Sequence, residues 1–285
     1  MTVQVFLNGR FVPEKRAVVS VFDRGFLYGD GLFEAVLVHH GKLFRWTEHL
    51  ERFHHGAVML DIKVPFAPKK LRIIANELIQ RNKVSTAILR LALSRGVGAR
   101  GYSPKGADMP TSVMSVHPLG ALASDRTRWN LVASSQRLPA GEPLAQFKNC
   151  NKLPQILARA EADQAGAEEA LLLNTDGFVV EGTTSNLFWI ERGTVCTPPL
   201  SSGILPGVTR AVILEICLTL KIKTREASVT LPKLKRMDGV FLSMTSLGVV
   251  GVLSLDGERL KQSPLVERIA MAYGKIVETE TGGHG

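Results

Sequence analysis

Cysteine and aromatic residues are scarce in this chain of 285 residues. There are three cysteines, and they lie far apart in the sequence, at Cys150, Cys196 and Cys217. An odd number at such spacing excludes a disulfide framework and a CxxC metal site, and it favours the reducing cytoplasm. Aromatic residues make up only 6% of the chain, which leaves few side chains on which nucleic-acid bases could stack.

Long apolar runs and dense basic runs are also missing. No apolar run approaches the length that spans a bilayer, and the first residues lack the apolar core of a signal peptide, so we expect no membrane partner. The net charge is +9, but the lysines and arginines are scattered, which disfavours nucleic acid as a partner. An acidic substrate or a phosphate-bearing cofactor accounts better for the charge.

The rest of the composition is that of an ordinary soluble globular protein, with 45% hydrophobic and 21% charged residues. Alternation before Asn8-Gly9 predicts a strand and a hairpin turn. Leu50, Phe53 and Ala57 have helical spacing, and Thr47 is the expected N-cap of their helix. Over the first 118 residues the patterns predict strands at 3–9, 10–13, 85–94 and 111–117, a strand pair around Gly41 within 31–44, and helices at 46–60 and 69–82.

The turn-rich stretch 117–130 has the composition of a connection between domains. We therefore expect an N-terminal domain over 1–118, a linker over 119–130 and a C-terminal domain over 131–285. Frequent antiparallel hairpins indicate an α+β fold with two lobes rather than a doubly wound sheet. The patterns predict helices at 151–166, 207–220 and 263–278, and strands at 169–174, 178–181, 185–190, 194–198 and 238–246.

The segment "SRGVGARGYSP" (94–104) has the GxGxxG spacing of a dinucleotide-binding fingerprint. That fingerprint requires a strand before the glycines and a helix that starts at the last one. A strand is predicted before Gly96, but Gly101 is followed by Tyr-Ser-Pro and further turn formers, which cannot open a helix. We therefore expect a loop here and no nucleotide.

Two pairs of adjacent histidines, His39-His40 and His54-His55, raise the question of a metal site. Neighbouring side chains on a strand point to opposite faces, and no carboxylate or cysteine stands at ligand spacing nearby. We expect no bound metal.

Four segments combine charge, glycine and turn residues more densely than packing requires: 23–34, 146–154, 179–190 and 202–213. Together they contain a lysine before a helix, a glutamate at a strand end and a Pro-Gly turn that leads into a helix N-terminus, which is a phosphate-binding feature. An amine-reactive lysine, a carboxylate and a phosphate site are what pyridoxal 5'-phosphate (PLP) requires.

The motifs "EGTTSNLFWI" and "ILPGVTR", in this order, resemble the class IV aminotransferases, the PLP enzymes of fold type IV. The resemblance covers nearly the whole chain. It implies a two-domain α+β fold, with a small N-terminal α/β lobe and a larger C-terminal lobe built on a barrel-like sheet. It also implies a homodimer whose active site takes residues from both subunits.

The resemblance assigns roles to individual residues. Lys148 matches the lysine that forms the Schiff base (aldimine) with PLP and moves a proton, with Lys152 as the competing lysine. Glu181 matches the carboxylate at the pyridine nitrogen, whose negative charge keeps that nitrogen protonated. The phosphate is expected to bind to Arg52, to the backbone amides of Val208 and Thr209, and to Thr245 and Ser246.

By the same resemblance, the loop around 94–104 borders the substrate pocket, and its glycines give it freedom to close. Arg100 is the expected partner of a substrate carboxylate. The other expected substrate-binding residues are Tyr28, Phe33, Arg90 and Tyr102.

Two reactions fit this family. A transaminase passes the amino group from an amino acid to a 2-oxo acid, whereas 4-amino-4-deoxychorismate lyase releases pyruvate and 4-aminobenzoate. "LYGDGLFE" and "RGVGARGY" resemble lyase sequences, while Thr245, Arg90, Tyr28 and Phe33 favour a transaminase. We expect transamination, with the lyase as the alternative.

Overall fold

The computed structural model describes residues 2–120 and 128–282, and its chain divides into two compact units. The first consists of Met1–Ala121, Phe147–Asn151 and Val277–Gly285, and the second of Leu122–Gln146 and Lys152–Ile276. The α+β fold class is confirmed. In the described residues, none of the helices is both long and apolar enough to cross a membrane.

The first unit contains a six-stranded sheet, counted over the described residues, in the order β2-β1-β6-β5-β3-β4. All of its pairings are antiparallel. Its strands are β1 (Gln4–Leu7), β2 (Arg10–Pro13), β3 (Gly31–His39), β4 (Lys42–Leu43), β5 (Ala87–Ser94) and β6 (Thr111–Pro118), and its helices are α1 (Arg24–Tyr28), α2 (Trp46–Met59) and α3 (Pro68–Asn82).

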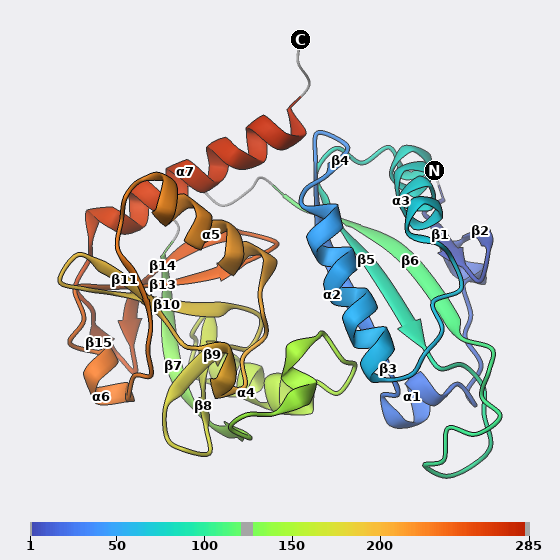
Figure 1. Ribbon diagram of the computed structural model, residues 1–285, viewed down its shortest axis with the longest axis horizontal. Helices are drawn as coiled ribbons and strands as arrows, with labels where there is room; N and C mark the ends of the chain where they lie inside the picture. The colour runs from blue at the N-terminus through green and yellow to red at the C-terminus, as the bar shows by residue number, and fades with distance from the viewer. Residues whose placement is uncertain (1, 121–127, 283–285) are drawn as a thin grey trace. The chain divides into compact units, whose positions relative to one another are not determined.

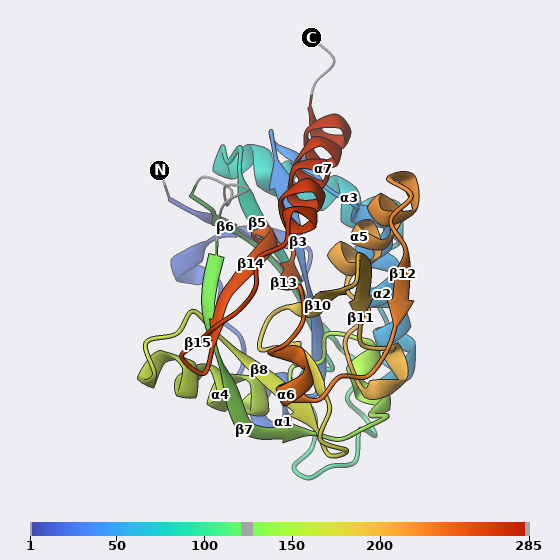
Figure 2. The same cartoon turned by 90° about the vertical axis from the view of Figure 1, so that its left-hand side faces the viewer.

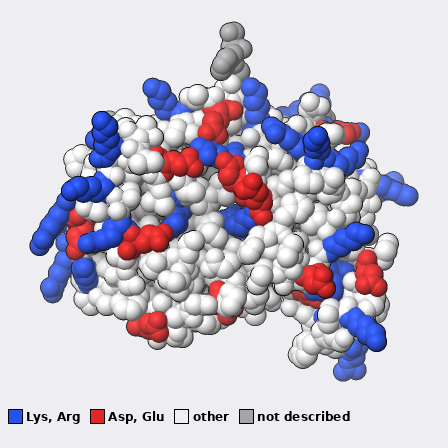
Figure 3. Space-filling view, in the orientation of Figure 1, with Lys and Arg blue, Asp and Glu red and all other residues white. Residues whose placement is uncertain are grey.

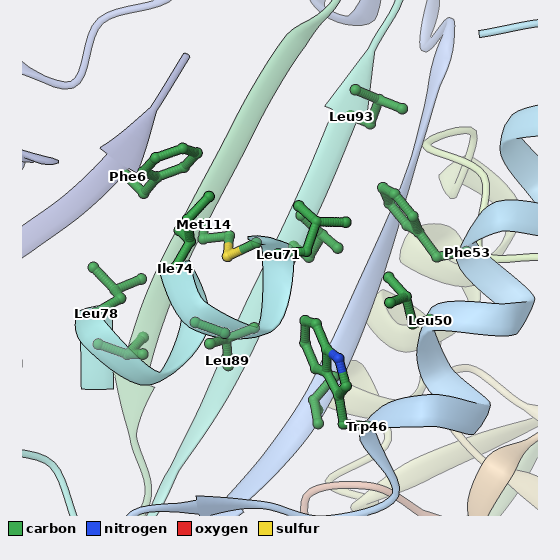
Figure 4. Packing of buried hydrophobic residues seen from close by; sticks show 14 of the residues in the cluster. Phe6, Trp46, Leu50, Phe53, Leu71, Ile74, Leu78, Leu89, Leu93 and Met114 are labelled. Atoms are coloured by element: carbon green, nitrogen blue, oxygen red, sulfur yellow. The ribbon is translucent and has the colours of Figure 1, made fainter. Parts of the chain in front are cut away.

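Helices α2 and α3 pack against this sheet and bury their apolar stripes on it (Figures 1 and 4). The predicted hairpin is present, because Asn8 and Gly9 both have positive φ, of 46° and 92°. Thr47 is not the N-cap of α2. The N-cap is Arg45, two residues before Thr47, and it has a left-handed conformation. The helix itself starts at Trp46.

The second unit is built on a closed ring of strands. Over the described residues the ring runs β10-β13-β14-β7-β8-β9, and β9 pairs back to β10. Figure 2 labels β10, β13, β14, β7 and β8 of this ring. Strand β7 runs parallel to both β8 and β14, while the other pairings of the ring are antiparallel. The barrel-like sheet that the family resemblance implies is therefore confirmed.

The elements of the ring and of the chain that covers it have the following bounds. The strands are β7 (Arg128–Leu138), β8 (Glu169–Asn174), β9 (Val179–Gly182), β10 (Asn186–Glu191), β11 (Thr194–Thr197), β12 (Thr224–Glu226), β13 (Gly239–Met244), β14 (Gly248–Leu255) and β15 (Glu258–Arg259). The helices are α4 (Leu153–Gln164), α5 (Val208–Thr219), α6 (Leu231–Leu234) and α7 (Pro264–Thr281), whose last residues belong to the first unit.

The observed units differ from the predicted domains at three places. Residues 147–151 and the end of α7 cluster with the first unit, because Phe147 is buried in its core and Glu278 contacts His39. Strand β7 begins at Arg128, inside the predicted linker, whose residues 121–127 lie outside the described ones. Strands β7 and β14 were not predicted.

Charged side chains of both signs share the molecular surface. On the face shown in Figure 3, lysine and arginine side chains are interspersed with aspartate and glutamate. The positive side chains on that face therefore have negative side chains as neighbours.

Gly56 of α2 provides a test of packing in the first unit. Alanine in a helix is normally more stable than glycine by about 0.5–1 kcal/mol. A Cβ at Gly56, however, would lie 2.7 Å from the ring of Phe147. Gly56→Ala should therefore lower the free energy of unfolding by about 1–3 kcal/mol, measured by urea denaturation.

Gly274 of α7 is the matched control, because a Cβ there would meet no atom within 4 Å. Gly274→Ala should stabilise the protein or leave it unchanged. Adding Phe147→Leu to Gly56→Ala should recover part of the loss. Equal effects of the two alanine substitutions would contradict the close contact between α2 and Phe147.

Candidate active site

Lys148 lies in a short segment that pairs with the start of β3. Its carbonyl oxygen accepts a hydrogen bond from the N–H of Phe33 at 2.8 Å, and the N–H of Cys150 donates to the carbonyl of Gly31 at 2.9 Å. The neighbouring Phe147 is 1% exposed in the core of the first unit. The backbone at Lys148 is thus held on both sides, which fixes the origin of its side chain.

The Lys148 side chain faces an aromatic ring that it shares with a second cation. Its Nζ lies 5.2 Å from the ring centroid of Phe33, and the guanidinium carbon of Arg90 lies 3.8 Å from the same centroid. All three residues are half-buried. Two cations at one partly desolvated ring create a positive potential that attracts an anionic ligand.

Behind this ring, on the α2 side of β3, a buried carboxylate binds an arginine and a histidine. Glu34 accepts hydrogen bonds from Arg52 Nε at 2.7 Å and Nη2 at 2.8 Å, one on each carboxylate oxygen. His49 Nδ1 lies 2.8 Å from Glu34 Oε2. None of the three residues is more than 9% exposed. The bidentate geometry fixes the guanidinium plane of Arg52.

The charge state of this group follows from its surroundings. Burial opposes ionisation of Glu34, but the charge of Arg52 and the hydrogen bonds from His49 and Arg52 outweigh it and lower the pKa to about 2. Burial lowers the pKa of His49, and the charges of Arg52 and Lys148 lower it further, against the opposing effect of Glu34. At neutral pH, Glu34 and Arg52 are therefore an ion pair, and a neutral His49 donates its Nδ1 hydrogen to Glu34.

Glu34 thus orients Arg52. The charges of Arg52 and Lys148 both lower the pKa of His49. The expected role of Arg52 in phosphate binding stays a prediction. Glu34 and His49 were not predicted as site residues. The only signal in the sequence is a charge inside the otherwise apolar strand "GLFEAVLV".

The loop after β5 is anchored by Arg24 and Tyr28. Arg24 donates to the carbonyl oxygens of Gly101 at 2.8 Å, Tyr102 at 3.0 Å and Ser103 at 3.1 Å. The Tyr28 hydroxyl accepts a hydrogen bond from the N–H of Gly101 at 3.0 Å, and its ring lies edge-on to that of Tyr102. Arg100 and Tyr102 project from this anchored loop as exposed side chains.

Two glycines of the loop lie close to other parts of the chain. A Cβ at Gly96 would lie 1.9 Å from the carbonyl oxygen of Met109, and one at Gly98 would lie 2.9 Å from Arg24, whereas one at Gly101 would meet no atom within 4 Å. Gly96 and Gly98 therefore permit close packing, and the freedom of the loop to close stays a prediction. Residues 102–110 contain no helix, so the loop lacks what a dinucleotide fingerprint requires.

In the second unit, Glu181 lies near the end of β9, where that strand meets β10. It accepts a hydrogen bond from the N–H of Leu205 at 3.1 Å, and its cross-strand partner Asn186 donates to the carbonyl of the same Leu205 at 2.9 Å. The two side chains therefore bind both backbone polar groups of Leu205, in the segment that leads to α5. Glu181 itself is half-buried.

The N-terminus of α5 has the features of an anion site. Val208 and Thr209 are its first two residues and are buried. Its N-cap is Gly207, and among the described residues no side chain caps this end. A Cβ at Gly207 would lie 2.0 Å from Asn186 Oδ1, so any larger residue there would displace the Asn186 side chain from Leu205. Uncapped amides and the helix dipole at this end suit a phosphate.

Thr245 and Ser246 lie in the turn between β13 and β14 and are half-buried. Strand β13 pairs with β10, where Ser243 lies opposite Asn186. The expected contact of Thr245 and Ser246 with a phosphate stays a prediction.

Glu169, at the start of β8, is a further residue that was not predicted. It is fully buried and accepts hydrogen bonds from Thr183 Oγ1 at 2.5 Å and Thr184 Oγ1 at 3.2 Å. These bonds hold the Thr-Thr turn that follows Glu181. An acidic residue at the head of the apolar run "EALLLN" is the sequence signal for it.

Comparison with known proteins identifies the family. The family model for amino-transferase class IV matches residues 31–255, well over half of the chain. The chain belongs to this family. It is 35% identical to the "Putative branched-chain-amino-acid aminotransferase" of Methanocaldococcus jannaschii, over 93% of this chain and 92% of that protein. It is 31% identical to the D-alanine aminotransferase of Staphylococcus aureus, over 98% and 99%.

Solved structures agree with this assignment. The branched-chain aminotransferase of Thermoproteus uzoniensis with norvaline has a TM-score of 0.92 at 28% identity, covering 99% of this chain and 97% of that one. The branched-chain amino acid aminotransferase of T.th. with pyridoxamine 5'-phosphate has a TM-score of 0.91 at 29%, covering 99% and 95%. The "Putative 4-amino-4-deoxychorismate lyase" of Legionella pneumophila has a TM-score of 0.86 at 28%, covering 92% and 97%.

The buried Glu34–Arg52 ion pair makes the free energy of unfolding depend on pH. Glu34→Gln removes the buried negative charge that faces the Arg52 guanidinium, so it should lower the free energy of unfolding by about 3–5 kcal/mol at pH 7. Because the folded pKa is about 2 and the usual value is 4.5, the stabilisation is complete above pH 4.5 and is lost as the pH falls towards 2. Urea denaturation over this range should show the difference between wild type and variant shrinking with acid.

The control is Glu77→Gln, which removes an exposed ion pair with Arg81 on α3. It should change stability by less than about 1 kcal/mol at any pH. A difference for Glu34→Gln that stays constant down to pH 2.5 would contradict the buried ion pair.

Proposed function

We propose that this enzyme is a PLP-dependent transaminase that moves an amino group between an amino acid and a 2-oxo acid. The observation that carries the proposal is the Lys148 amine held 5.2 Å from the Phe33 ring centroid, with Arg90 at the same ring. A nucleophilic amine in a partly desolvated, positively charged setting is what a carbonyl-bearing phosphate cofactor requires. A similar structure contains pyridoxamine 5'-phosphate.

The residues of both units fit PLP by their chemistry. Lys148 would hold the cofactor covalently through Nζ, and the Glu181 carboxylate would face the ring nitrogen. The uncapped amides of Val208 and Thr209 suit the phosphate, because Gly207 leaves that helix end open. Arg52 would add a positive charge to the phosphate site, and Glu34 orients its guanidinium group. Thr245 and Ser246 would complete the phosphate site.

When bound, PLP supplies an electron sink for negative charge that forms at the substrate Cα. Lys148 would remove the Cα proton and return it at a different atom, since its amine is released when a substrate amine takes its place. Glu181 would keep a proton on the ring nitrogen by its negative charge. Glu169 would act as a positioning residue, because it holds the turn that follows Glu181.

For the substrate, we propose an amino acid with a small apolar side chain. The relatives are named for branched-chain amino acids and for D-alanine, which share this property. Phe33 would contact the side chain, and Arg90 the carboxylate. Arg100 and Tyr102 of the anchored loop, with Tyr28 of α1, would bind the carboxylate of an acidic second substrate such as a 2-oxo dicarboxylic acid.

The lyase reaction is the second candidate. It needs the same lysine and glutamate, and a lyase neighbour is similar over 92% of this chain. The loop around Arg100 also resembles lyase sequences. Only the products distinguish the two reactions.

We propose further that the enzyme is a homodimer with a shared active site. The segment before and within α1 exposes an unusual run of apolar side chains, which a second copy of the chain would cover: Val18, Val21, Phe22, Phe26 and Leu27, all at least 44% exposed. We place the enzyme in the cytoplasm, as the few and widely spaced cysteines favour.

The experiment that decides the reaction offers the purified protein D- and L-amino acids with 2-oxoglutarate and, in parallel, 4-amino-4-deoxychorismate. Transamination should convert 2-oxoglutarate to glutamate when alanine, valine or leucine of one configuration is the amino donor, and the donor should be released as its 2-oxo acid. Formation of 4-aminobenzoate and pyruvate alone would replace the transaminase proposal by the lyase.

Lys148→Ala tests the cofactor attachment. Wild type should be yellow, and borohydride should fix the cofactor to the peptide that contains residue 148, read by mass spectrometry. The variant should lose this adduct and fall at least about 10³-fold in turnover, because both attachment and proton transfer depend on the amine. Lys152→Ala is the control and should keep both. An adduct at residue 152 would overturn the assignment.

A further inference from the structure

The hairpin between β3 and β4 meets the last turns of α7 in a cluster of two histidines and one glutamate. His39 Nε2 lies 2.7 Å from Glu278 Oε1, and His40 Nε2 lies 3.2 Å from Glu278 Oε2. Each residue offers one ligand atom, and these three atoms, two imidazole nitrogens and one carboxylate oxygen, all lie within 4.8 Å of one another. Within the described residues, it is the one such group of three or more metal-ligating side chains.

The local backbone explains why two adjacent histidines act together. Alternation on a regular strand would point them to opposite faces, and the expectation of no metal rested on that rule. His40, however, has a φ of +50° and is followed by Gly41 at +70°, so the strand has already turned into the hairpin. The two ring centroids are only 4.1 Å apart as a result. The geometric argument against a metal at this pair is therefore wrong.

The third ligand comes from a distant part of the sequence. Glu278 lies on α7, 238 residues beyond His40, and it presents one carboxylate oxygen to each imidazole. No spacing rule for metal motifs would find such a ligand, and for this reason it was not predicted.

We propose that His39, His40 and Glu278 form a binding site for a divalent transition metal of the zinc class. Two imidazoles and one carboxylate are a ligand set that Zn²⁺ accepts, with water in the fourth position of a tetrahedron. Ligand atoms about 2 Å from the ion lie roughly 3.3 Å from each other in that geometry. The three ligand atoms here lie within 4.8 Å of one another, and each imidazole nitrogen lies 2.7 or 3.2 Å from a carboxylate oxygen, so small side-chain rotations would bring them to these separations.

The surrounding charges permit a cation. Arg45 is the nearby guanidinium, and its charge is balanced by Glu48 at 3.1 Å and Glu280 at 3.0 Å. The Lys42 amine donates to the carbonyl of Gly282 at 3.3 Å. The side chains of His40 and Glu278 are 51% and 59% exposed, so an ion can reach them from solvent. A bound ion would fasten the end of α7 to the β3–β4 hairpin of the first unit.

Zinc titration by calorimetry tests the site on the full chain, without a histidine tag and after treatment with a chelator. Wild type should bind one Zn²⁺ per chain at this site with micromolar or tighter affinity at pH 7.5. His40→Gln and Glu278→Gln, both exposed positions that tolerate substitution, should each weaken binding at least about tenfold. Binding should also weaken at pH 5.5, because protons compete with the metal ion for its ligand atoms.

His55→Gln is the matched control, because His55 is also exposed and belongs to the other adjacent pair. Its affinity should equal that of wild type. The thermal midpoint should rise with Zn²⁺ in wild type and in His55→Gln but not in the two site variants. Equal zinc affinity in wild type, His40→Gln and Glu278→Gln would overturn the proposal, as would no binding by wild type up to 100-fold molar excess of zinc (~1 mM).

Discussion

The backbone pairing between residues 147–151 and β3 is the constraint on which the first unit's chemistry depends. Two main-chain hydrogen bonds carry Lys148 from a segment between two elements of the second unit to the strand that bears Phe33 and Glu34. Phe147 locks the same segment from the other side by filling the space left by Gly56. The role proposed for Lys148 requires a side chain of defined origin in a partly dry setting, and this arrangement meets both requirements.

The second unit obtains its rigidity from closure. A ring of strands has no open edge between β9 and β10, and that seam is where Glu181 and Asn186 lie opposite each other. Both side chains hold Leu205, which precedes an uncapped helix N-terminus. Each unit also holds a buried carboxylate that orients its neighbours: Glu34 orients Arg52 in the first unit, and Glu169 holds the Thr183–Thr184 turn in the second.

Acidic side chains play two different parts in the first unit. Glu34 neutralises Arg52, which offsets the cost of burying that charge, and it also sets the direction of the guanidinium. The exposed Glu278 behaves differently, since it meets two histidines at the surface. The first arrangement stabilises a charge already present, whereas the second leaves room for an external cation.

By itself, the sequence determined the elements with clear periodicity and the family. Hairpins such as Asn8-Gly9, the helices over 46–60 and 207–220, and the motifs around Lys148, Glu181 and Val208 all depend on local propensity or on short patterns. Only the tertiary structure decided the ring closure through β7 and β14, the burial of Glu34 and Glu169, the anchoring of the Arg100 loop by Arg24, and the meeting of Glu278 with His39 and His40. These features join residues that are far apart in the chain. Contacts of this kind produce no local pattern in the sequence, so only the folded chain shows them.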